Sequence, residues 1–354
     1  MIDFIKQHVL PNFGIEVEAK VSPLGNGHIN DTFLVRGQHG EMVLQRINTE
    51  VFKTPFALVN NAQKIAQHLR EKRQQAEYQL KVVSPLMTQA NELAIDLGDK
   101  GFWRAINYLP NSHSIDVVGD EQQAQAAAKA FGHFSQALSD FDAEQIEDVI
   151  PQFHHLPGRI QQLEQAVASN GQQRLHDCQA WVDFALTQQS LLQELADIEP
   201  QLPKRICHND TKINNMLFDK RDMSSMAIID LDTCMKGHLM YDFGDMVRTF
   251  CSPEEEDSTN LSNVQVRETI FAAICQGYLS ELSSILTEAE RQSLWLGAKI
   301  ICLMIGVRFL TDHLNGDVYF NIHHENHNLE RAANQFTLYK SLLENQAALQ
   351  QHLS

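Results

Sequence analysis

The chain of 354 residues is long enough to build two lobes around sizeable hydrophobic cores. Its hydrophobic content of 43% and charged content of 21% are ordinary for a soluble globular protein. The formal net charge of −17 argues against broad nucleic-acid binding, because such binding needs basic patches that neutralise phosphates.

The start of the given sequence does not resemble a targeting signal. No basic segment followed by an apolar stretch opens it, so we expect no signal peptide and a cytoplasmic location. The six cysteines are scattered without a CxxC pair, which is typical of reduced thiols that fill a core. The most apolar stretch, residues 297–310, contains Lys299 and Arg308 and is far short of a membrane span, so it predicts a buried helix. We expect neither a nucleic acid nor a membrane as a partner, and the oligomeric state is left open.

The first hundred or so residues predict a small lobe of antiparallel strands and one helix. Strand-like segments are expected at residues 17–23, 31–36, 41–47, 79–83 and 102–108. A helical pattern covers residues 55–73, with apolar residues at Leu58, Ile65 and Leu69. A turn-rich loop, GNGHIND at residues 25–31, separates the first two strands, and a connector follows at residues 109–112.

From about residue 120 the pattern changes to helices. Helical spacing is expected at residues 121–138, 158–168, 175–195, 264–286, 288–314 and 326–349. Between them, residues 206–232 are β-like again, with short apolar runs at 216–218 and 226–231. The predicted fold class is α+β, with a small antiparallel β-sheet lobe at residues 1–108 and a larger, mostly helical lobe at residues 109–354.

The segment ICHNDTKINNMLFD, residues 206–219, carries the most informative pattern. It places His208, Asp210 and Asn215 in an H-x-D-x-x-x-x-N spacing between two apolar strands, and Asp230 follows in AIIDLDT. Phosphoryl transfer needs one carboxylate that orients the attacking hydroxyl, and further oxygen ligands that hold magnesium against the phosphates. Asp210 fits the first role, and Asn215 with Asp230 fits the second. His208 is expected to orient the loop through hydrogen bonds to the backbone.

Each of these residues also has a structural interpretation, because Asn and Asp often cap turns at strand ends. Their combined spacing favours the catalytic interpretation over three independent turn residues. In the loop at residues 25–31, Gly25 and Gly27 let the backbone approach phosphate oxygens closely. They do not form GxGxxG, and an ordinary hairpin turn is the alternative.

Together these motifs resemble the aminoglycoside-phosphotransferase-like kinases, a family that also holds choline, homoserine and fructosamine kinases. Within that family the chain most resembles the N-acetylhexosamine 1-kinase subgroup, over nearly its full length. The resemblance rests on GNGHINDTFLV (25–35), LQRINTEVFK (44–53), HNDTKINNMLFD (208–219), IIDLDT (228–233), YDFGDMVR (241–248) and RFLTDHLNGDVYF (308–320). It implies a protein-kinase-like two-lobed fold, with the nucleotide-binding lobe first and the catalytic and substrate-binding lobe second. It also implies ATP as the phosphate donor and magnesium as the metal.

The resemblance assigns roles around the predicted catalytic segment. Asp210 would be the catalytic base, and Asn215 and Asp230 would be the magnesium ligands. Asp232, expected two residues further along the same strand, would point to the same side and support a second metal or its waters. Asp242 would brace the catalytic loop, with a plain acid at a helix N-terminus as the alternative.

Further residues would bind the nucleotide and the sugar. The resemblance implies that Gly25, Gly27 and Asn30 contact the nucleotide, and that His28 and Asp31 contact the sugar.

Two residues late in the chain would line the sugar pocket. Arg308 interrupts an apolar helical pattern, and a buried arginine is costly unless it is paired or bound to something. An internal salt bridge is one interpretation; the resemblance implies instead that Arg308 and Tyr319 line the sugar pocket. Histidines 323, 324 and 327 show no zinc-ligand spacing and predict surface positions.

One feature departs from the kinase pattern. Protein-kinase-like folds carry a lysine on the third strand that holds the α- and β-phosphates and pairs with a helix glutamate. The segment EMVLQRIN offers Gln45 and Arg46 instead. Arg46 is the expected phosphate contact, although strand parity could favour Gln45. The following helix has no glutamate in its first turns, where Asn60 or Asn61 could substitute.

Three functions compete. The main hypothesis is an ATP- and magnesium-dependent kinase that phosphorylates the anomeric hydroxyl of an N-acetylhexosamine to give the sugar 1-phosphate. The second keeps the chemistry but takes another small alcohol, of the aminoglycoside, choline or homoserine type. The third is a catalytically dead nucleotide-binding scaffold, which only the missing lysine supports. Because Asp210, Asn215 and Asp230 are all present, the pattern favours an active kinase with a small-molecule substrate.

Overall fold

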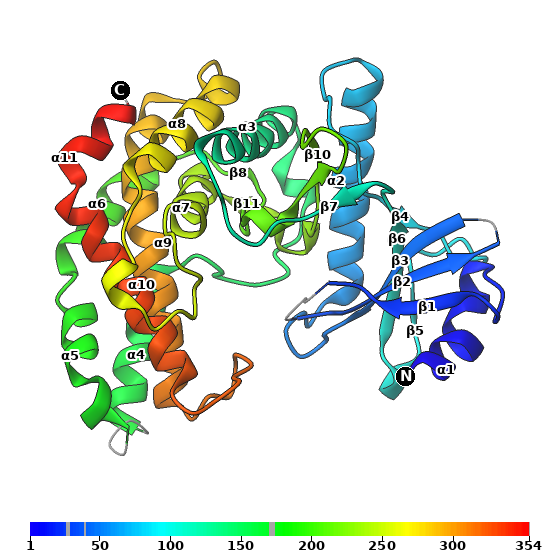
Figure 1. Ribbon diagram of the computed structural model, residues 1–354, viewed down its shortest axis with the longest axis horizontal. Coiled ribbons are helices and arrows are strands. Elements are labelled where there is room, and N and C mark those ends of the chain that lie inside the picture. The colour runs from blue at the N-terminus through cyan, green and yellow to red at the C-terminus, as the bar shows by residue number, and fades with distance from the viewer. Residues whose placement is uncertain (26–28, 39, 170–173, 354) are drawn as a thin grey trace. The chain divides into compact units, whose positions relative to one another are not determined.

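The computed structural model describes residues 1–25, 29–38, 40–169 and 174–353. The chain divides into two compact units, each assembled from separate stretches of sequence (Figure 1). The N-terminal unit comprises Met1–His113, Asp140–Pro151 and Leu217–Lys236. The C-terminal unit comprises Ser114–Ser139, Gln152–Met216 and Gly237–Ser354.

An antiparallel sheet forms the centre of the N-terminal unit. Its strand order is β1-β2-β3-β6-β4, and β5 also pairs with β6. The strands are β1 (Lys20–Pro23), β2 (Asp31–Gly37), β3 (Gly40–Ile47), β4 (Pro85–Leu86), β5 (Ala94–Asp96) and β6 (Phe102–Asn107). The register places Gln45 of β3 between Thr32 of β2 and Arg104 of β6, so these three side chains share one face.

The two faces of this sheet have different neighbours. Leu44 and Trp103 share a buried core with the N-terminal turns, which are α1 (Ile2–Phe4), η1 (Ile5–Val9) and η2 (Leu10–Phe13). On the opposite face, the ring of Phe102 meets that of Phe56 edge-on, with centroids 4.7 Å apart. Phe56 belongs to α2 (Pro55–Gln74), which confirms the predicted helix and buries its predicted apolar positions. The face that carries Gln45 and Arg104 is therefore the face toward α2.

The N-terminal unit also takes up a later stretch of chain. A small sheet has the order β10-β9-β7, formed by β7 (Ser112–His113), β9 (Met216–Asp219) and β10 (Ser225–Ile228). The turn η8 (Leu231–Thr233) follows β10 directly, and β11 (Met235–Gly237) follows the turn. Asn61 of α2 holds another returning segment, because its amide bonds to the backbone of Glu147 in both directions, at 2.8 and 3.1 Å.

Helices dominate the C-terminal unit. They are α3 (Glu121–Ala137), α4 (Leu156–Ser169), α5 (Leu175–Leu186), α6 (Gln189–Ile198), α7 (Leu239–Phe250), α8 (Glu268–Leu282), α9 (Glu288–Leu314), α10 (His327–Glu344) and α11 (Gln346–Leu349). Helix α9 packs against α7, α10 and α4, while α3 runs along α8. The short strand β8 (Arg205–Cys207) and the turn η7 (Ile213–Asn215) flank the segment that carries Asp210.

Helix α9 is the axis of this unit. By length and composition it could cross a membrane, but most of its apolar residues are buried inside the protein. It is therefore a core helix, as the apolar stretch at residues 297–310 predicts. Gly297 of α9 and Gly244 of α7 lie so close that a Cβ on either would collide with the backbone of the other helix. These two glycines let α7 and α9 approach backbone to backbone.

Some predicted elements differ from the structure. The helix expected over residues 326–349 is interrupted, because α10 ends at Glu344 and α11 begins at Gln346. Residues 79–83 form no strand, because Lys81 makes one isolated backbone bond to Met226 and no ladder. The helix expected over residues 175–195 is two helices, α5 and α6. The side chains of Thr187 and Gln188 both donate to the carbonyl of Phe184, and such bonds compete with the helical pattern. All six cysteines are buried and free, which confirms that they fill the core.

Candidate active site

The loop that carries Asp210, residues 208–212, leaves β8 through a left-handed residue. Asn209 has φ +62°, a conformation that asparagine tolerates better than most residues. His208 is fully buried, and the rings of Phe131 and Phe134 meet it edge-on. Its Nδ1 atom accepts from the backbone N–H of Asp210 at 3.3 Å, as expected for an orienting residue. We call this segment the Asp210 loop.

Asp242 of α7 holds the Asp210 loop by its backbone. Its two carboxylate oxygens accept from the N–H groups of His208, at 2.9 Å, and Asn209, at 2.7 Å. Its own carbonyl accepts from the hydroxyl of Thr211 at 2.7 Å. Asp242 is therefore a brace for this loop and not merely an acid in the first turn of a helix. Burial raises the pKa of Asp242 to about 7, against the opposing effect of the two N–H groups.

Asp210 itself is fixed by two neighbours. Asn215 Nδ2 donates to both the carbonyl and the Oδ2 atom of Asp210, each at 2.8 Å. Lys212 Nζ lies 3.0 Å from Asp210 Oδ1. Burial raises the pKa of Asp210, but the charges of Lys212 and His208 and the bonds from Lys212 and Asn215 outweigh it, so the net pKa is lowered. The Asp210 carboxylate is thus ionised at neutral pH and able to accept a hydrogen bond from a hydroxyl.

Asn215 is suited to a second task. Because its Nδ2 is engaged with Asp210, its side-chain oxygen is the atom that can bind a cation. Within the described ranges, no group of three or more His, Cys, Asp or Glu side chains could hold a metal ion by itself. A hard cation at Asn215 would therefore need oxygen ligands of other kinds, and magnesium commonly takes phosphate oxygens and water. The donor chemistry of Asn215 fits that ion.

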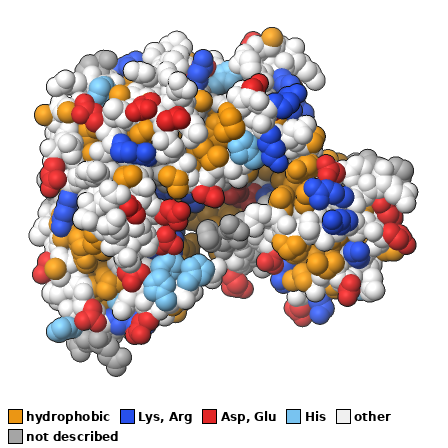
Figure 2. Space-filling view, viewed as in Figure 1, with side chains coloured by type: hydrophobic (Ala, Val, Ile, Leu, Met, Phe, Trp, Pro, Cys, Tyr) orange, Lys and Arg blue, Asp and Glu red, His pale blue; other side chains and the backbone are white. Residues whose placement is uncertain are grey.

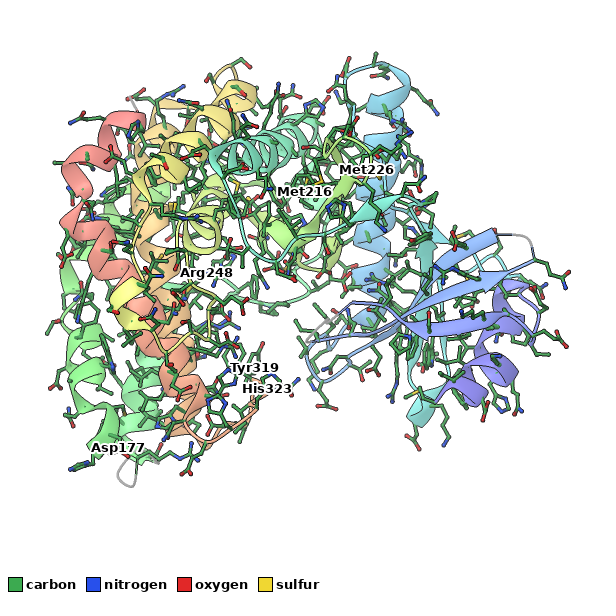
Figure 3. All side chains as sticks on the ribbon, viewed as in Figure 1. Asp177, Met216, Met226, Arg248, Tyr319 and His323 are labelled. Carbon is green, nitrogen blue, oxygen red and sulfur yellow. The ribbon has the colours of Figure 1, made fainter. Side chains whose placement is uncertain are left out.

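A second charged group lies behind the Asp210 loop. Arg248 of α7, labelled in Figure 3, bonds to Asp245 at 2.9 Å and to Glu256 at 2.5 Å. Glu256 is also bonded by Arg331 at 2.5 Å. Each carboxylate of this charged group, Asp245 and Glu256, is therefore paired with at least one arginine. Lys212, whose pKa is raised chiefly by Asp210 and further by Asp245, was not assigned in the sequence analysis, although its place two residues after Asp210 could have flagged it.

In the N-terminal unit, Asp230 does not lie on a strand as expected. Strand β10 ends at Ile228, and Asp230 caps the turn η8 with φ +61°. Asp230 is exposed, while Asp232 within the turn is buried. The inference that both carboxylates point to one side of a strand is therefore wrong, because the chain turns between them. Asp232 instead pairs with Arg104 of β6, at 2.5 Å.

The loop at residues 25–31 is partly described. Gly27 and His28 lie outside the described residues. Gly25 has φ +71° with open space around its Cα, so it suits the turn expected there. Asn30 uses both ends of its amide internally, donating to Asp232 at 2.9 Å and accepting from the backbone of Asn48 at 2.9 Å. The nucleotide and sugar contacts expected of this loop stay predictions.

Gln45 and Arg46 point to opposite faces of the sheet, as successive strand residues must. Gln45 lies on the face toward α2, where its Oε1 atom accepts from Arg104. Arg46 lies on the other face, over Gly101, and its Nη1 atom is 3.6 Å from Asp31 Oδ2. The phosphate contact expected of Arg46 stays a prediction. Arg104 was missed in the sequence analysis, although a lone arginine in the apolar segment FWRAI was a usable signal.

Arg308 of α9 lies in a cluster of aromatic rings. Its guanidinium carbon is 5.6 Å from the ring centre of Phe153, 5.7 Å from that of Tyr319 and 5.3 Å from that of Phe320. No carboxylate among the described residues lies within ion-pairing distance of it. Burial, followed by the nearby charge of Arg159, lowers the pKa of Arg308 to about 10. An internal salt bridge is therefore not the reason for this arginine, and Arg308 and Tyr319 do lie together as expected.

The segment that carries Tyr319 is held by one buried carboxylate. Asp312 accepts from three successive backbone N–H groups, of Val318 at 3.0 Å, Tyr319 at 2.8 Å and Phe320 at 2.9 Å. A further bond comes from Asn328 at 3.0 Å. The aromatic side chains over Arg308 are thus presented by a fixed backbone, and Tyr319 itself is exposed.

His154 links this aromatic cluster to the Asp210 loop. Its Nε2 atom lies 3.2 Å from the carbonyl of Asn209, and its ring contacts those of Phe153 and Tyr241. Burial, followed by the charge of Arg308, lowers the pKa of His154 to about 3, so its imidazole is neutral. Nothing in the local sequence pattern signalled this residue.

Histidines 323, 324 and 327 differ from one another in exposure. His323 and His324 are exposed, as predicted, and histidines gather on the face drawn in Figure 2. His323 lies near Tyr319 in Figure 3. His327 is buried, with its Nε2 atom 3.6 Å from Asp257, so its predicted surface position is wrong. It opens α10, and that helix packs against α9.

The raised pKa of Asp242 predicts a pH-dependent stability. Its ordinary value is 3.8, so between about pH 4 and pH 7 the folded state binds more protons at this site than the unfolded chain does. The contribution of Asp242 to the free energy of unfolding therefore falls as the pH rises through this window. Asp242→Asn cannot ionise, and we expect it to cost more stability at about pH 5 than at about pH 8, measured by urea unfolding.

Asp222→Asn is the matched control for that comparison. Asp222 is exposed and its pKa is lowered by Ser224, so it titrates below the window and the substitution should have the same effect at both pH values. An Asp242→Asn variant that loses more stability at the higher pH would contradict the assignment.

Comparison with known proteins places this geometry in a family. Residues 20–282 match the model of the phosphotransferase enzyme family. Similar solved structures include an aminoglycoside phosphotransferase from Alicyclobacillus acidocaldarius, with 14% identity, a TM-score of 0.63, and coverage of 98% of this chain and 96% of that chain. A microcompartment-associated aminopropanol kinase has 15% identity and a TM-score of 0.61, covering 96% of this chain and 97% of that chain. A spectinomycin phosphotransferase, solved with ADP and spectinomycin, has 13% identity and a TM-score of 0.54, covering 100% and 96%.

At identities of 13–15%, the similarity to these solved structures shows the fold alone. They confirm the predicted α+β, protein-kinase-like fold, with its antiparallel sheet and its mostly helical remainder. The family match itself extends over most of the chain and includes the Asp210 loop, Asn215 and Asp242. The chain belongs to the phosphotransferase enzyme family.

Proposed function

We propose that the protein is an ATP- and magnesium-dependent kinase that phosphorylates the anomeric hydroxyl of an N-acetylhexosamine and releases the sugar 1-phosphate. One observation carries the proposal. An ionised carboxylate, Asp210, lies on a braced loop, and the same unit holds an arginine among aromatic rings with no carboxylate partner.

Asp210 is the proposed base. Its carboxylate accepts a hydrogen bond from the attacking hydroxyl, aims the hydroxyl oxygen at the γ-phosphorus and takes up the proton as the new O–P bond forms. The bond between the γ-phosphorus and the β–γ bridging oxygen breaks in the same transfer, and ADP leaves with its electron pair. Positioning contributes most of the rate in such a transfer, because little covalent chemistry is left for the protein. The bonds from Asn215 and Lys212 keep the carboxylate from rotating away.

Asn215 and Asp230 are the proposed magnesium ligands. The side-chain oxygen of Asn215 and the exposed carboxylate of Asp230 are both hard donors of the kind that magnesium takes. When bound, the ion neutralises charge on the phosphate oxygens. Asn215 is the last residue of the short turn η7, and Asp230 caps the start of the short turn η8.

Arg308 and its rings support a neutral acceptor with a carbonyl group. The guanidinium can donate to the N-acetyl oxygen or to sugar hydroxyls, and aromatic faces such as that of Tyr319 pack on the apolar side of a sugar ring. Arg159 adds a second positive charge near Arg308, and no carboxylate among the described residues lies within ion-pairing distance of Arg308. Such a positive site disfavours a cationic acceptor, because two like charges in a partly buried place repel strongly.

A second candidate keeps the chemistry and changes the acceptor to an amino alcohol or an aminoglycoside. Proteins of similar fold are named for such substrates, among them the aminopropanol kinase and the aminoglycoside phosphotransferase. The positive charge of Arg308 disfavours such cationic acceptors. A panel of acceptors tests the sugar against the amino alcohols and aminoglycosides.

The panel experiment follows ADP release with ATP, magnesium and N-acetylhexosamines, other hexoses, choline, aminopropanol and aminoglycosides. We expect turnover with an N-acetylhexosamine, and we expect Asp210→Asn to lower kcat by roughly 10²- to 10⁴-fold, because the base is lost while the loop keeps its shape. Asp222→Asn, on an exposed turn, is the control and should keep the parental kcat. Turnover of Asp210→Asn within a few-fold of the parent rules Asp210 out as the base, and a panel without turnover rules out the kinase for these acceptors.

Arg308→Met should separate acceptor binding from nucleotide binding. Loss of a desolvated hydrogen-bond donor usually costs about 1.5–3 kcal/mol when its partner is charged and less when it is neutral. We therefore expect KM for the sugar to rise about tenfold or more, while KM for ATP stays within about twofold. Arg291→Met, on the same helix outside the aromatic cluster, is the control. An unchanged KM for the sugar in Arg308→Met would remove Arg308 from the pocket.

A further inference from the structure

The N-terminal unit contains a buried ion pair that none of the proposed roles uses. Arg104 and Asp232 are each 3% exposed, and Arg104 Nη2 lies 2.5 Å from Asp232 Oδ1. Removing two charges from water costs free energy, and their mutual attraction recovers only part of that cost. Apolar side chains of similar volume in the same position therefore often give a protein of equal or greater stability. Stability alone is therefore a weak reason for this pair.

Neutral amides bracket the pair on both sides. Gln45 Oε1 accepts from Arg104 Nε at 3.0 Å and from Nη2 at 2.8 Å. Asn30 Nδ2 donates to Asp232 Oδ2 at 2.9 Å, and its own oxygen accepts from the backbone of Asn48 at 2.9 Å. Arg104 of β6 thus connects Gln45 of β3 to Asp232 in the turn η8. Asn30, the residue before β2, is bonded to the same Asp232.

The pair occupies the region where kinase-like folds keep a lysine and a glutamate. That lysine belongs to the third strand, and the glutamate belongs to the helix that follows it. Here the third strand offers Gln45, and the register places Arg104 directly opposite on β6. The single carboxylate of α2 is Glu71 in its last turns, and Asn61 is engaged with the backbone of Glu147. Arg104 and Asp232 supply a positive and a negative charge next to Gln45, while α2 has no carboxylate in its first turn.

Asp232 is also close in sequence to the proposed magnesium ligand Asp230. Asp230 has φ +61° and ψ +60°, the left-handed region, which aspartate enters more readily than most residues with a side chain. The turn η8 follows at once and includes Asp232. The ion pair with Arg104 and the hydrogen bond from Asn30 hold Asp232, and they thereby fix the segment that sets the direction of the Asp230 carboxylate.

We propose that Arg104 and Asp232 form a positioning pair that holds Asp230 in place as a metal ligand. The inference rests on the proposed function, because that function gives Asp230 its role. The pair acts through Asp230 and needs no contact of its own with the substrate.

The test measures metal binding directly. The affinity of the ADP-bound protein for Mn²⁺ is measured by electron paramagnetic resonance for the parent, Asp232→Asn and Arg104→Met, beside the magnesium dependence of turnover. Loss of a residue that supports a metal ligand typically costs about 10- to 100-fold in affinity. We expect a loss of about that size in both variants, with less than about a twofold change in KM for the acceptor. Arg36→Met is the matched control, since Arg36 pairs with Glu41 on the same sheet at an exposed position.

Conservative variants guard against misfolding. Arg104→Lys keeps the charge, and Gln45→Arg combined with Arg104→Gln moves the guanidinium to the neighbouring strand. The exchanged variant should recover most of the Mn²⁺ affinity that Arg104→Gln loses, and these variants decide the question if Arg104→Met does not fold. Lower melting temperatures with parental Mn²⁺ affinity would show a structural pair only and overturn the proposal.

Different results would overturn the proposed function and the positioning role of the pair. If the parent binds ADP and Mn²⁺ but phosphorylates no acceptor, the proposed function fails while the affinities still decide the role of the pair. If the parent binds no Mn²⁺ in the presence of ADP, the positioning role is overturned as well.

Discussion

The geometry of the C-terminal unit depends on a single buried carboxylate, that of Asp242. Its two oxygens bind the N–H groups of His208 and Asn209, and these bonds hold Asn209 in its left-handed conformation. Asp242 can do this because α7 is itself fixed against α9 at Gly244 and Gly297, where no side chain separates the helices. The packing of α7 against α9 therefore fixes the position of Asp242, and through Asp242 the position of the Asp210 loop. The loop is placed before any substrate arrives, which lowers the cost of ordering it during the reaction.

Charge is distributed unevenly between the proposed catalytic and acceptor-binding groups. Asp210 keeps its negative charge because Lys212 and Asn215 are close, while the carboxylates behind it are matched by Arg248 and Arg331. Around Arg308, aromatic rings take the place of counter-ions. A cation held by rings is free to meet a neutral oxygen of a ligand without first breaking a salt bridge. This contrast is the physical basis for preferring an uncharged sugar to an amino alcohol.

The sequence predicted well what depends on local pattern. The fold class, helix α9, the spacing of His208, Asp210 and Asn215, and the meeting of Arg308 with Tyr319 could all be read from periodicity, motif or resemblance. Predictions from local pattern were wrong where contacts with residues distant in sequence determine the conformation. Asp230 looked strand-borne because its neighbours are apolar, but the chain turns there to bring Asp232 to Arg104. No window around Arg104 contains its ion-pair partner Asp232, and none around His154 contains Asn209, whose carbonyl its imidazole meets.

The most direct measurement identifies the product formed from ATP and an N-acetylhexosamine by phosphorus and proton nuclear magnetic resonance. We expect a phosphate on the anomeric oxygen, visible as phosphorus coupling to the anomeric proton and as loss of the free reducing end. A phosphate on any other hydroxyl, or transfer to amino alcohols with none to the sugar, would contradict it.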